Sequence, residues 1–131
     1  MVFLGGCLCG NLRYKSEQSA LNTGYCHCLI CRKSTSAPVV AFASFSVDDF
    51  SYTNGVPSVY QSSSTGQREF CGKCGAQICH RGTVNSKTVD VNSGTLDNME
   101  LVSPQFHIYT KDSVSWFKIN DQLPRYAKGA G

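Results

Sequence analysis

The spacing of the cysteines constrains this chain more than any other feature of its sequence. Eight cysteines occur in 131 residues, and all but one lie in three short groups: Cys7-x-Cys9, Cys26-x-Cys28-x2-Cys31 and Cys71-x2-Cys74. Cysteines one or two residues apart are poorly placed to form a disulfide with each other, whereas a tight turn can direct their sulfurs at one metal ion. The pattern therefore predicts metal binding in preference to structural disulfides or a redox dithiol.

Zinc is the metal that best suits such groups, because it accepts four thiolates in a tetrahedron and has no redox chemistry. The first and last groups supply two cysteines each, and together they would complete one closed site. A closed four-thiolate site is structural, and this one would tie the start of the chain to its middle. Its predicted ligands are Cys7, Cys9, Cys71 and Cys74.

The middle group predicts a different kind of site. Cys26, Cys28 and Cys31 supply three thiolates from six consecutive residues. Three ligands leave the fourth position of a second zinc ion open, as in catalytic zinc sites. Cys79 would close that position if it reached the metal, but we expect it to be a buried or half-buried thiol on a strand.

Composition and charge exclude several classes of protein. With 41% hydrophobic and 16% charged residues, the chain is too apolar to be intrinsically disordered, and its length suits a single domain over residues 1–131. The net charge is +3, and Arg32-Lys33 is the one adjacent basic pair, which excludes a polybasic tract for nucleic acid or a membrane surface. No apolar run is long enough to span a membrane, and no signal peptide is visible. These features predict a soluble, cytoplasmic protein.

Short strand-like segments, separated by glycine, proline, serine and asparagine, predict a mostly β fold. The Asn54-Gly55 pair lies between two such segments and is typical of a β-hairpin turn. Residues 29–34 are expected to form one helical turn behind the second cysteine group. Strands are expected at residues 11–15, 37–45, 50–53, 59–61, 68–70, 77–81, 88–92, 106–109 and 114–117.

Three motifs in a fixed order carry a resemblance to a known family. They are Gly6-Cys7-Leu8-Cys9-Gly10, Cys26-His27-Cys28-Leu29-Ile30-Cys31-Arg32-Lys33 and Phe70-Cys71-Gly72-Lys73-Cys74-Gly75. Weaker matches continue at Gly94-Thr95-Leu96-Asp97-Asn98, Pro104, His107-Ile108, Trp116 and Leu123-Pro124. In this order they resemble the glutathione-dependent formaldehyde-activating (GFA) family, which also includes centromere protein V.

The resemblance implies a β-tent fold of short antiparallel sheets stapled by two zinc ions, with the ligands divided as above. It also implies a carbon–sulfur lyase that forms or cleaves S-(hydroxymethyl)glutathione, with glutathione as co-substrate. The expected partners are therefore a small-molecule thiol and an aldehyde, and neither nucleic acid nor a membrane. The alternative is a non-catalytic binding module with two structural zinc ions.

Several side chains near the motifs have weaker assignments. Arg32 and Lys33 follow the three-cysteine group and are candidates to bind the carboxylates of the thiol. His27 is expected to point away from the metal, and His80 and His107 are expected to be structural. Asp97 is expected to cap a turn. Expected contributors to the core or a pocket wall are Phe106, Tyr109 and Trp116.

Overall fold

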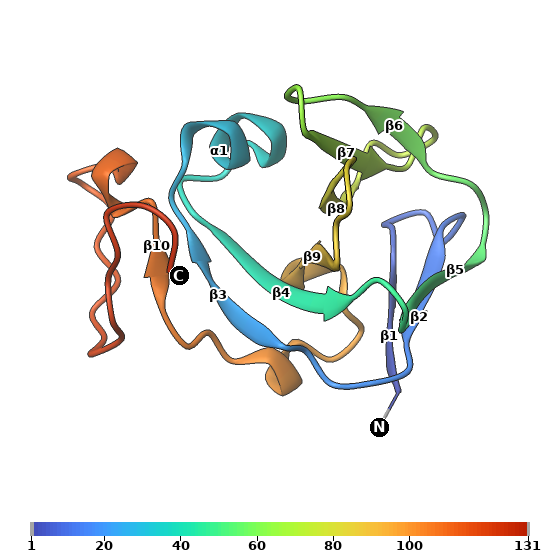
Figure 1. Cartoon of the computed structure of the whole chain (residues 1–131), viewed down its shortest axis with the longest axis horizontal. Helices are drawn as coiled ribbons and strands as arrows, with labels where there is room; N and C mark the ends of the chain where they lie inside the picture. Colours follow the sequence, from blue (N-terminus) through green and yellow to red (C-terminus); the bar gives the residue numbers. More distant parts are fainter. Residues whose placement is uncertain (1, 131) are drawn as a thin grey trace.

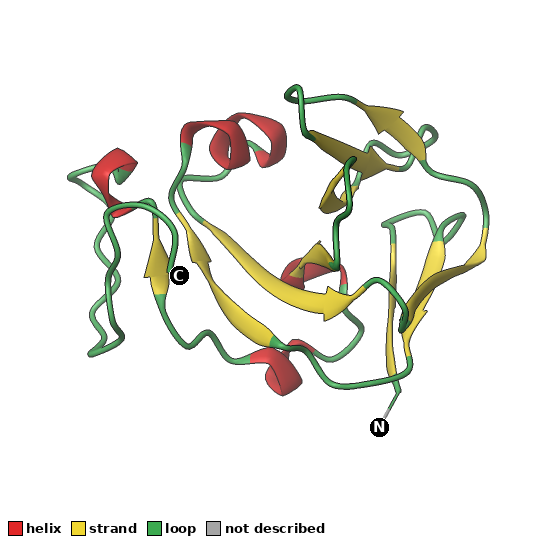
Figure 2. Ribbon diagram, viewed as in Figure 1, coloured by secondary structure: helices red, strands yellow, loops and turns green. Residues whose placement is uncertain are grey.

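The computed structural model describes residues 2–130, which contain ten strands and one α-helix (Figures 1 and 2). The strands form two sheets, and the helical segments connect strands of the larger sheet or follow its last strand. The mostly β fold of one small domain, expected from the sequence, is confirmed. The helical segments are α1 (Leu29–Thr35) and the 3-10 helices Ser93–Thr95, Met99–Val102 and Thr110–Asp112.

A three-stranded antiparallel sheet holds the start of the chain and has the order β1-β2-β5. Residues alternate between its two faces, as the period of a strand requires. On β2, for example, Tyr14 and Ser16 are buried while Arg13 and Lys15 are partly exposed. The strands are β1 (Phe3–Gly6), β2 (Arg13–Ser16) and β5 (Phe50–Asn54).

The second sheet has seven strands in the order β10-β3-β4-β9-β8-β7-β6 and curls around the helix and the loops at its upper end (Figure 1). Its neighbours are antiparallel except for β10, which pairs with β3 in parallel. The expected antiparallel pairing therefore holds for the other strand pairs, and β10 makes this sheet a mixed one. The strands are β3 (Asn22–Cys26), β4 (Val40–Ser46), β6 (Ser58–Tyr60), β7 (Gly66–Phe70), β8 (Gln77–Gly82), β9 (Thr88–Asn92) and β10 (His107–Ile108).

The hydrophobic core joins the two sheets. It takes Leu12 and Tyr14 from one side, and Phe45, Ile78 and Val91 from the other, all no more than 1% exposed. Burying an aliphatic or aromatic side chain contributes about 1.5–3 kcal/mol. A core of this size is modest for the length of the chain, which leaves room for metal sites to contribute to stability.

The hairpin predicted at Asn54-Gly55 does not form. The strand before it, β5, pairs with β2, whereas the strand after it, β6, pairs with β7 in the other sheet. Gly55 does have the positive φ of +75° that the turn signal anticipates. There the chain passes from one sheet to the other instead of folding back on itself.

The sequence did not predict two strands, β1 and β3, because each contains glycine, which weakens the sequence pattern of a strand. A side chain at Gly5 would place its Cβ 2.3 Å from the Tyr14 hydroxyl, and one at Gly24 would lie 2.7 Å from the Phe106 ring. These glycines allow a close approach of packed aromatic rings. Glycine is nevertheless depleted in strands, so sequence patterns count it against them.

Three further expectations are wrong, two of them near the C-terminus. Residues 114–117 form a turn, in which the N–H of Phe117 donates to the carbonyl of Val114, and not a strand. Trp116 is 75% exposed and therefore belongs to neither the core nor a pocket wall. Asp97 does not cap a turn with its side chain, because its carboxylate pairs with both terminal nitrogens of Arg13.

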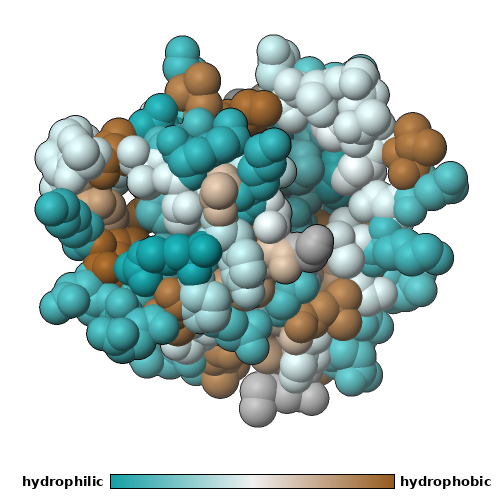
Figure 3. All heavy atoms as spheres, turned by 60° about the vertical axis from the view of Figure 1, so that its left-hand side comes forward, coloured by the Kyte–Doolittle hydropathy of each residue, from teal (hydrophilic) through white to brown (hydrophobic). Residues whose placement is uncertain are grey.

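Exposed hydrophobic side chains are spread over several elements of the described chain. Exposed hydrophobic side chains such as Leu8, Val56 and Trp116 are far apart in sequence, and on the face in Figure 3 apolar residues are scattered among polar ones. Scattered single residues of this kind are ordinary on protein surfaces. Among the described residues, no helix is long and apolar enough to cross a membrane.

Candidate metal centres

Four cysteines from two distant loops converge at one point. Cys7 and Cys9 lie in the β1–β2 connection, and Cys71 and Cys74 lie in the β7–β8 connection, on the other sheet. The four sulfurs all lie within 4.8 Å of one another. This cluster therefore links the two sheets directly, and the structure brings together the four residues that their spacing predicts as one ligand set.

The two loops of this cluster share a local geometry. The N–H of Gly10 donates to the carbonyl of Cys7 at 3.2 Å, and the N–H of Gly75 donates to that of Cys71 at 2.8 Å. Both glycines have a left-handed φ, +81° and +79°, which other residues adopt with strain. The N–H of Leu12 also donates to the Cys7 sulfur at 3.2 Å. Such amide contacts favour the thiolate form that metals bind.

The distances in the four-cysteine cluster fit a tetrahedral metal ion. Four sulfurs at about 2.3 Å from a zinc ion are about 3.8 Å apart. The Cys7 and Cys9 sulfurs are 3.6 Å apart, and those of Cys9 and Cys71 are 3.8 Å apart. The donor set and its spacing therefore suit zinc, and the site is closed, because four protein ligands fill a tetrahedron.

Three cysteines form the second cluster, all within one turn of chain. Cys26 ends β3, Cys28 is the N-cap residue of α1, and Cys31 lies in the first turn of that helix. Their sulfurs also lie within 4.8 Å of one another. The N–H of Cys31 donates to the Cys28 sulfur at 3.3 Å, which sets the direction of that thiol.

Crowding makes these three thiols titrate unequally. Hydrogen bonds from Cys26 and Cys31 hold the pKa of Cys28 well below its ordinary value. Contacts with Cys28 and Cys31, together with burial, raise the pKa of Cys26 far above it. Three neighbouring thiolates thus repel one another, and a divalent cation between them removes that repulsion.

Within residues 2–130, no fourth metal-binding side chain joins the three-cysteine cluster. Cys79 lies elsewhere, on β8, where it is 2% exposed and contacts the carboxylate of Glu69 at 3.3 Å. Burial raises the pKa of this thiol to about 12. Cys79 is therefore a buried thiol of a strand, as expected, and does not close the second site.

The three cysteines line a cavity of about 460 Å³, which we call the thiol cavity. Part of its wall is apolar, with Val40, Phe42 and Ile108. Other parts are polar, and among them His80 Nδ1 lies 3.8 Å from a carboxylate oxygen of Asp90. A metal ion held at this cluster would therefore face a space large enough for a small ligand.

The cations near the cluster differ from those that the sequence suggested. A second cavity adjoins the thiol cavity at Ile30 and Arg68. Arg32 lines neither cavity, and Lys33 lines only the second one. Arg68, on β7, lies beside the cluster, with a terminal nitrogen 3.6 Å from the Cys31 sulfur. Sequence analysis missed Arg68 because it is 37 residues away from Cys31 and only strand pairing places it there. Its one sequence signal was its position three residues before Cys71.

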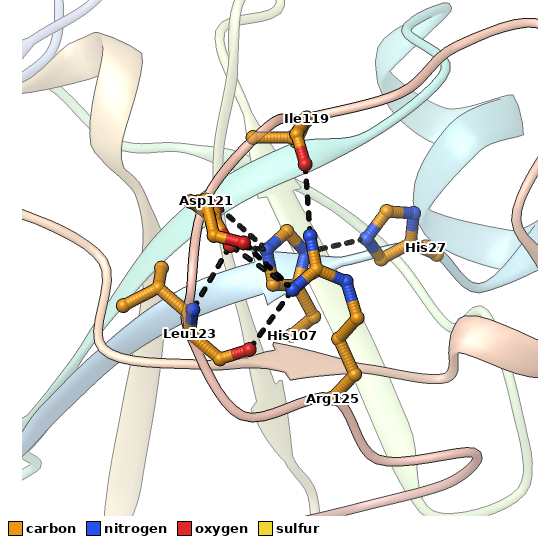
Figure 4. A network of polar contacts seen from close by, with 6 residues as sticks. All are labelled: His27, His107, Ile119, Asp121, Leu123 and Arg125. Carbon is orange, nitrogen blue, oxygen red and sulfur yellow. Dashed lines mark hydrogen bonds and ion pairs between the residues drawn. The ribbon is translucent and has the colours of Figure 1, made fainter.

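His27 lies between two of the cysteines but points away from them, as expected. Its Nε2 is 2.9 Å from His107 Nδ1, and His107 Nε2 is 3.0 Å from Asp121 (Figure 4). Asp121 in turn pairs with Arg125 at 3.1 Å. An ionised Asp121 accepts a hydrogen bond from the Nε2–H of His107, which leaves His107 Nδ1 to accept one from His27. The network thus fixes the back of the cysteine loop against the C-terminal segment.

Comparison with known proteins identifies the fold family. The model of the family described as glutathione-dependent formaldehyde-activating enzyme matches residues 2–112. The chain belongs to the GFA family. All seven clustered cysteines lie within the matched residues.

Two known proteins are similar to this chain over most of its length. An uncharacterized lyase of Schizosaccharomyces pombe is 28% identical over 99 residues, which cover 76% of this chain and 72% of that protein. The crystal structure of a Rhodobacter sphaeroides protein is similar with a TM-score of 0.61 and 25% identity. That similarity covers 72% of this chain and 88% of that one.

The His27 network extends beyond the part of the chain that the GFA model matches. His27 and His107 lie within residues 2–112, whereas Asp121 and Arg125 follow them. The N–H of Tyr126 donates to the carbonyl of His107, and that of His107 donates to Pro124, so the last segment runs along β10. This GFA-family chain therefore braces the loop of its three-cysteine cluster with residues from outside the matched region.

Proposed function

We propose that this protein is a zinc-dependent carbon–sulfur lyase that binds a small thiol and forms or cleaves its adduct with an aldehyde. Glutathione and formaldehyde are the proposed thiol and aldehyde. One observation carries this proposal: three thiols converge in the wall of a cavity without a fourth protein donor among residues 2–130. Membership of the GFA family and the lyase name of the Schizosaccharomyces pombe relative support the reaction class.

The residues of the chain have distinct proposed roles in this reaction. Cys26, Cys28 and Cys31 would hold a zinc ion, which when bound favours the thiolate form of an incoming thiol at neutral pH. Val40 and Phe42 give the space beside these cysteines an apolar wall for the apolar atoms of a ligand.

The chemistry itself needs little more than proximity. In the forward direction the thiol sulfur bonds to the carbonyl carbon, the thiol gives up its proton, and the carbonyl oxygen gains one. The reverse reaction breaks the same carbon–sulfur bond. His80, which the sequence analysis expected to be structural, lines the same cavity, and its imidazole is the proposed group that gives and takes this proton.

The four-cysteine site has a structural role in this proposal.

All eight cysteines are free thiols, and both sites need reduced sulfur. We therefore place the protein in a reducing compartment such as the cytoplasm.

Calorimetric titration of the zinc-loaded protein with glutathione and with S-methylglutathione tests the proposal. Glutathione should bind, with an affinity that rises with pH because binding releases the thiol proton, whereas the S-methyl compound should not. Cys28→Ser should abolish binding, and Cys79→Ser, the matched control at a thiol outside both clusters, should leave it unchanged. Equal binding of the two ligands would favour a non-catalytic module with two structural zinc ions.

A further inference from the structure

Arg68 is a buried cation at the edge of the thiol cavity. Arg68 is 8% exposed, and one of its terminal nitrogens donates to the Ser34 hydroxyl at 3.1 Å. The other terminal nitrogen faces the Cys31 sulfur at 3.6 Å. Its Nε is buried and has no hydrogen-bond partner. The guanidinium group therefore keeps part of its hydrogen-bonding capacity unused.

A second arginine, the half-buried Arg81 on the neighbouring strand β8, has the carboxylate partner that Arg68 lacks. Arg81 lies 2.6 Å from the carboxylate of Glu69, which also accepts from the Tyr52 hydroxyl at 2.8 Å. Among residues 2–130, no carboxylate lies within 4.0 Å of the Arg68 side chain. The opposite charge that faces Arg68 is therefore the cysteine cluster, through one terminal nitrogen. Its buried Nε has no hydrogen-bond partner, and an anionic ligand would supply one.

Arg68 also borders a second cavity, of about 480 Å³, which we call the anion cavity. Arg68 and Ile30 line both this cavity and the thiol cavity, so the two adjoin at these residues. Lys33 lies at the exposed rim of the anion cavity, and Ser62 and Gln77 add hydrogen-bonding groups. Its lining has two cations and no carboxylate.

We propose that Arg68, with Lys33 at the rim, forms a carboxylate subsite for the thiol that enters the thiol cavity. This inference rests on the proposed thiol-binding function and specifies the substrate class as a thiol that carries a carboxylate. Because Arg68 lies 3.6 Å from the Cys31 sulfur, a short spacer between the sulfur and the carboxylate is sufficient. Guanidinium groups bind carboxylates through paired, charge-assisted hydrogen bonds, so Arg68 supplies most of the recognition.

The competing explanation is that Arg68 only balances the negative charge of the cysteine cluster. That role would make Arg68 equally important for every thiol, whether or not the thiol carries a carboxylate. A pair of ligands that differ only in the carboxylate therefore separates the two explanations.

The experiment is a calorimetric titration of the zinc-loaded protein with 3-mercaptopropionate and with its uncharged amide. The acid should bind at least about tenfold more tightly, as expected for a charge-assisted contact with a buried cation. Arg68→Gln should lower the affinity for the acid by that factor and leave the affinity for the amide unchanged. Lys33→Gln should lower the affinity for the acid by less. Arg32→Gln is the matched control, because Arg32 lies on the same helix as Lys33 but lines neither cavity. It should change the affinity for neither ligand.

The comparison of acid and amide on the unaltered protein needs no variant, so it holds even if Arg68→Gln fails to fold. Equal affinities for acid and amide would overturn the carboxylate subsite and leave the thiol-binding function standing. An Arg68→Gln variant that weakens both ligands equally would also overturn it, in favour of charge balance alone. If neither ligand binds, the proposed function fails and the subsite fails with it.

Discussion

The two cysteine clusters use the same side chain for different purposes, and the arrangement of the chain around them separates these purposes. The four-cysteine cluster joins loops 62 residues apart, Cys9 with Cys71, and connects two sheets. The three-cysteine cluster spans six residues of one loop and constrains little of the chain beyond it. It lies instead in the wall of a cavity. The first position thus suits stability and the second suits ligand binding.

The largest expected effect is the loss of a ligand from the four-cysteine cluster. Cys71→Ser should remove several kcal/mol of folding free energy, because the metal binds only where the two loops are already together. A domain of this size has about 5–15 kcal/mol in total, so the variant should be largely unfolded. Cys28→Ser should remain folded and lose about 1–2 kcal/mol. Urea denaturation followed by circular dichroism checks both, and equal losses would make both clusters structural.

Removal of metal should divide into two stages. A chelator added in steps should first take the metal from the three-cysteine cluster, which has fewer ligands and faces a cavity. The far-ultraviolet circular dichroism should hardly change at that stage. The second metal should leave only as the sheets unfold, since its ligands come from both of them. If both ions left together as the protein unfolded, the two clusters would not differ in their structural role.

A smaller effect is expected at the histidine network behind the three-cysteine loop. His107→Phe leaves His27 and Asp121 without their shared partner (Figure 4). The loss should be about 1–3 kcal/mol of unfolding free energy, with faster hydrogen exchange in the 26–31 loop. His80→Phe, which changes a half-buried histidine outside this network, is the control and should leave the hydrogen exchange of the 26–31 loop unchanged. Unchanged exchange in the loop would show that the network does not brace it.

The smallest effect should come from the ion pair between Arg13 and Asp97, beside the first cysteine loop. Both side chains are more than one-third exposed, so Arg13→Gln should cost less than about 1 kcal/mol. The hydrogen bond from Arg13 lowers the pKa of Asp97. The contribution of this ion pair to the free energy of unfolding is therefore fully present above the ordinary carboxyl pKa of about 4. It disappears as the pH falls through the lowered pKa of Asp97. If Arg13→Gln lowered the free energy of unfolding as much as Cys71→Ser does, metal binding would not be the main source of stability at this loop.

Sequence alone gave the two cysteine groupings, because tight spacing limits where sulfurs can point. It also located most strands from their apolar patterns. It could not find β1 and β3, where Gly5 and Gly24 are required by packed aromatic rings and hide the strand signal. Nor could it find Arg68, Asp90 or Asp121 as neighbours of the site. Their positions depend on strand order and on the path of the C-terminal segment, and neither follows from local patterns.

The central claim is that one cluster is closed and the other has room for an external thiol. X-ray absorption at the zinc edge tests it directly, because it counts the sulfur ligands per metal ion. With both sites loaded, clusters of four and three cysteines predict an average of about 3.5 sulfurs, rising to about four when glutathione is added. An average of four sulfurs without glutathione, or no change on its addition, would contradict the account.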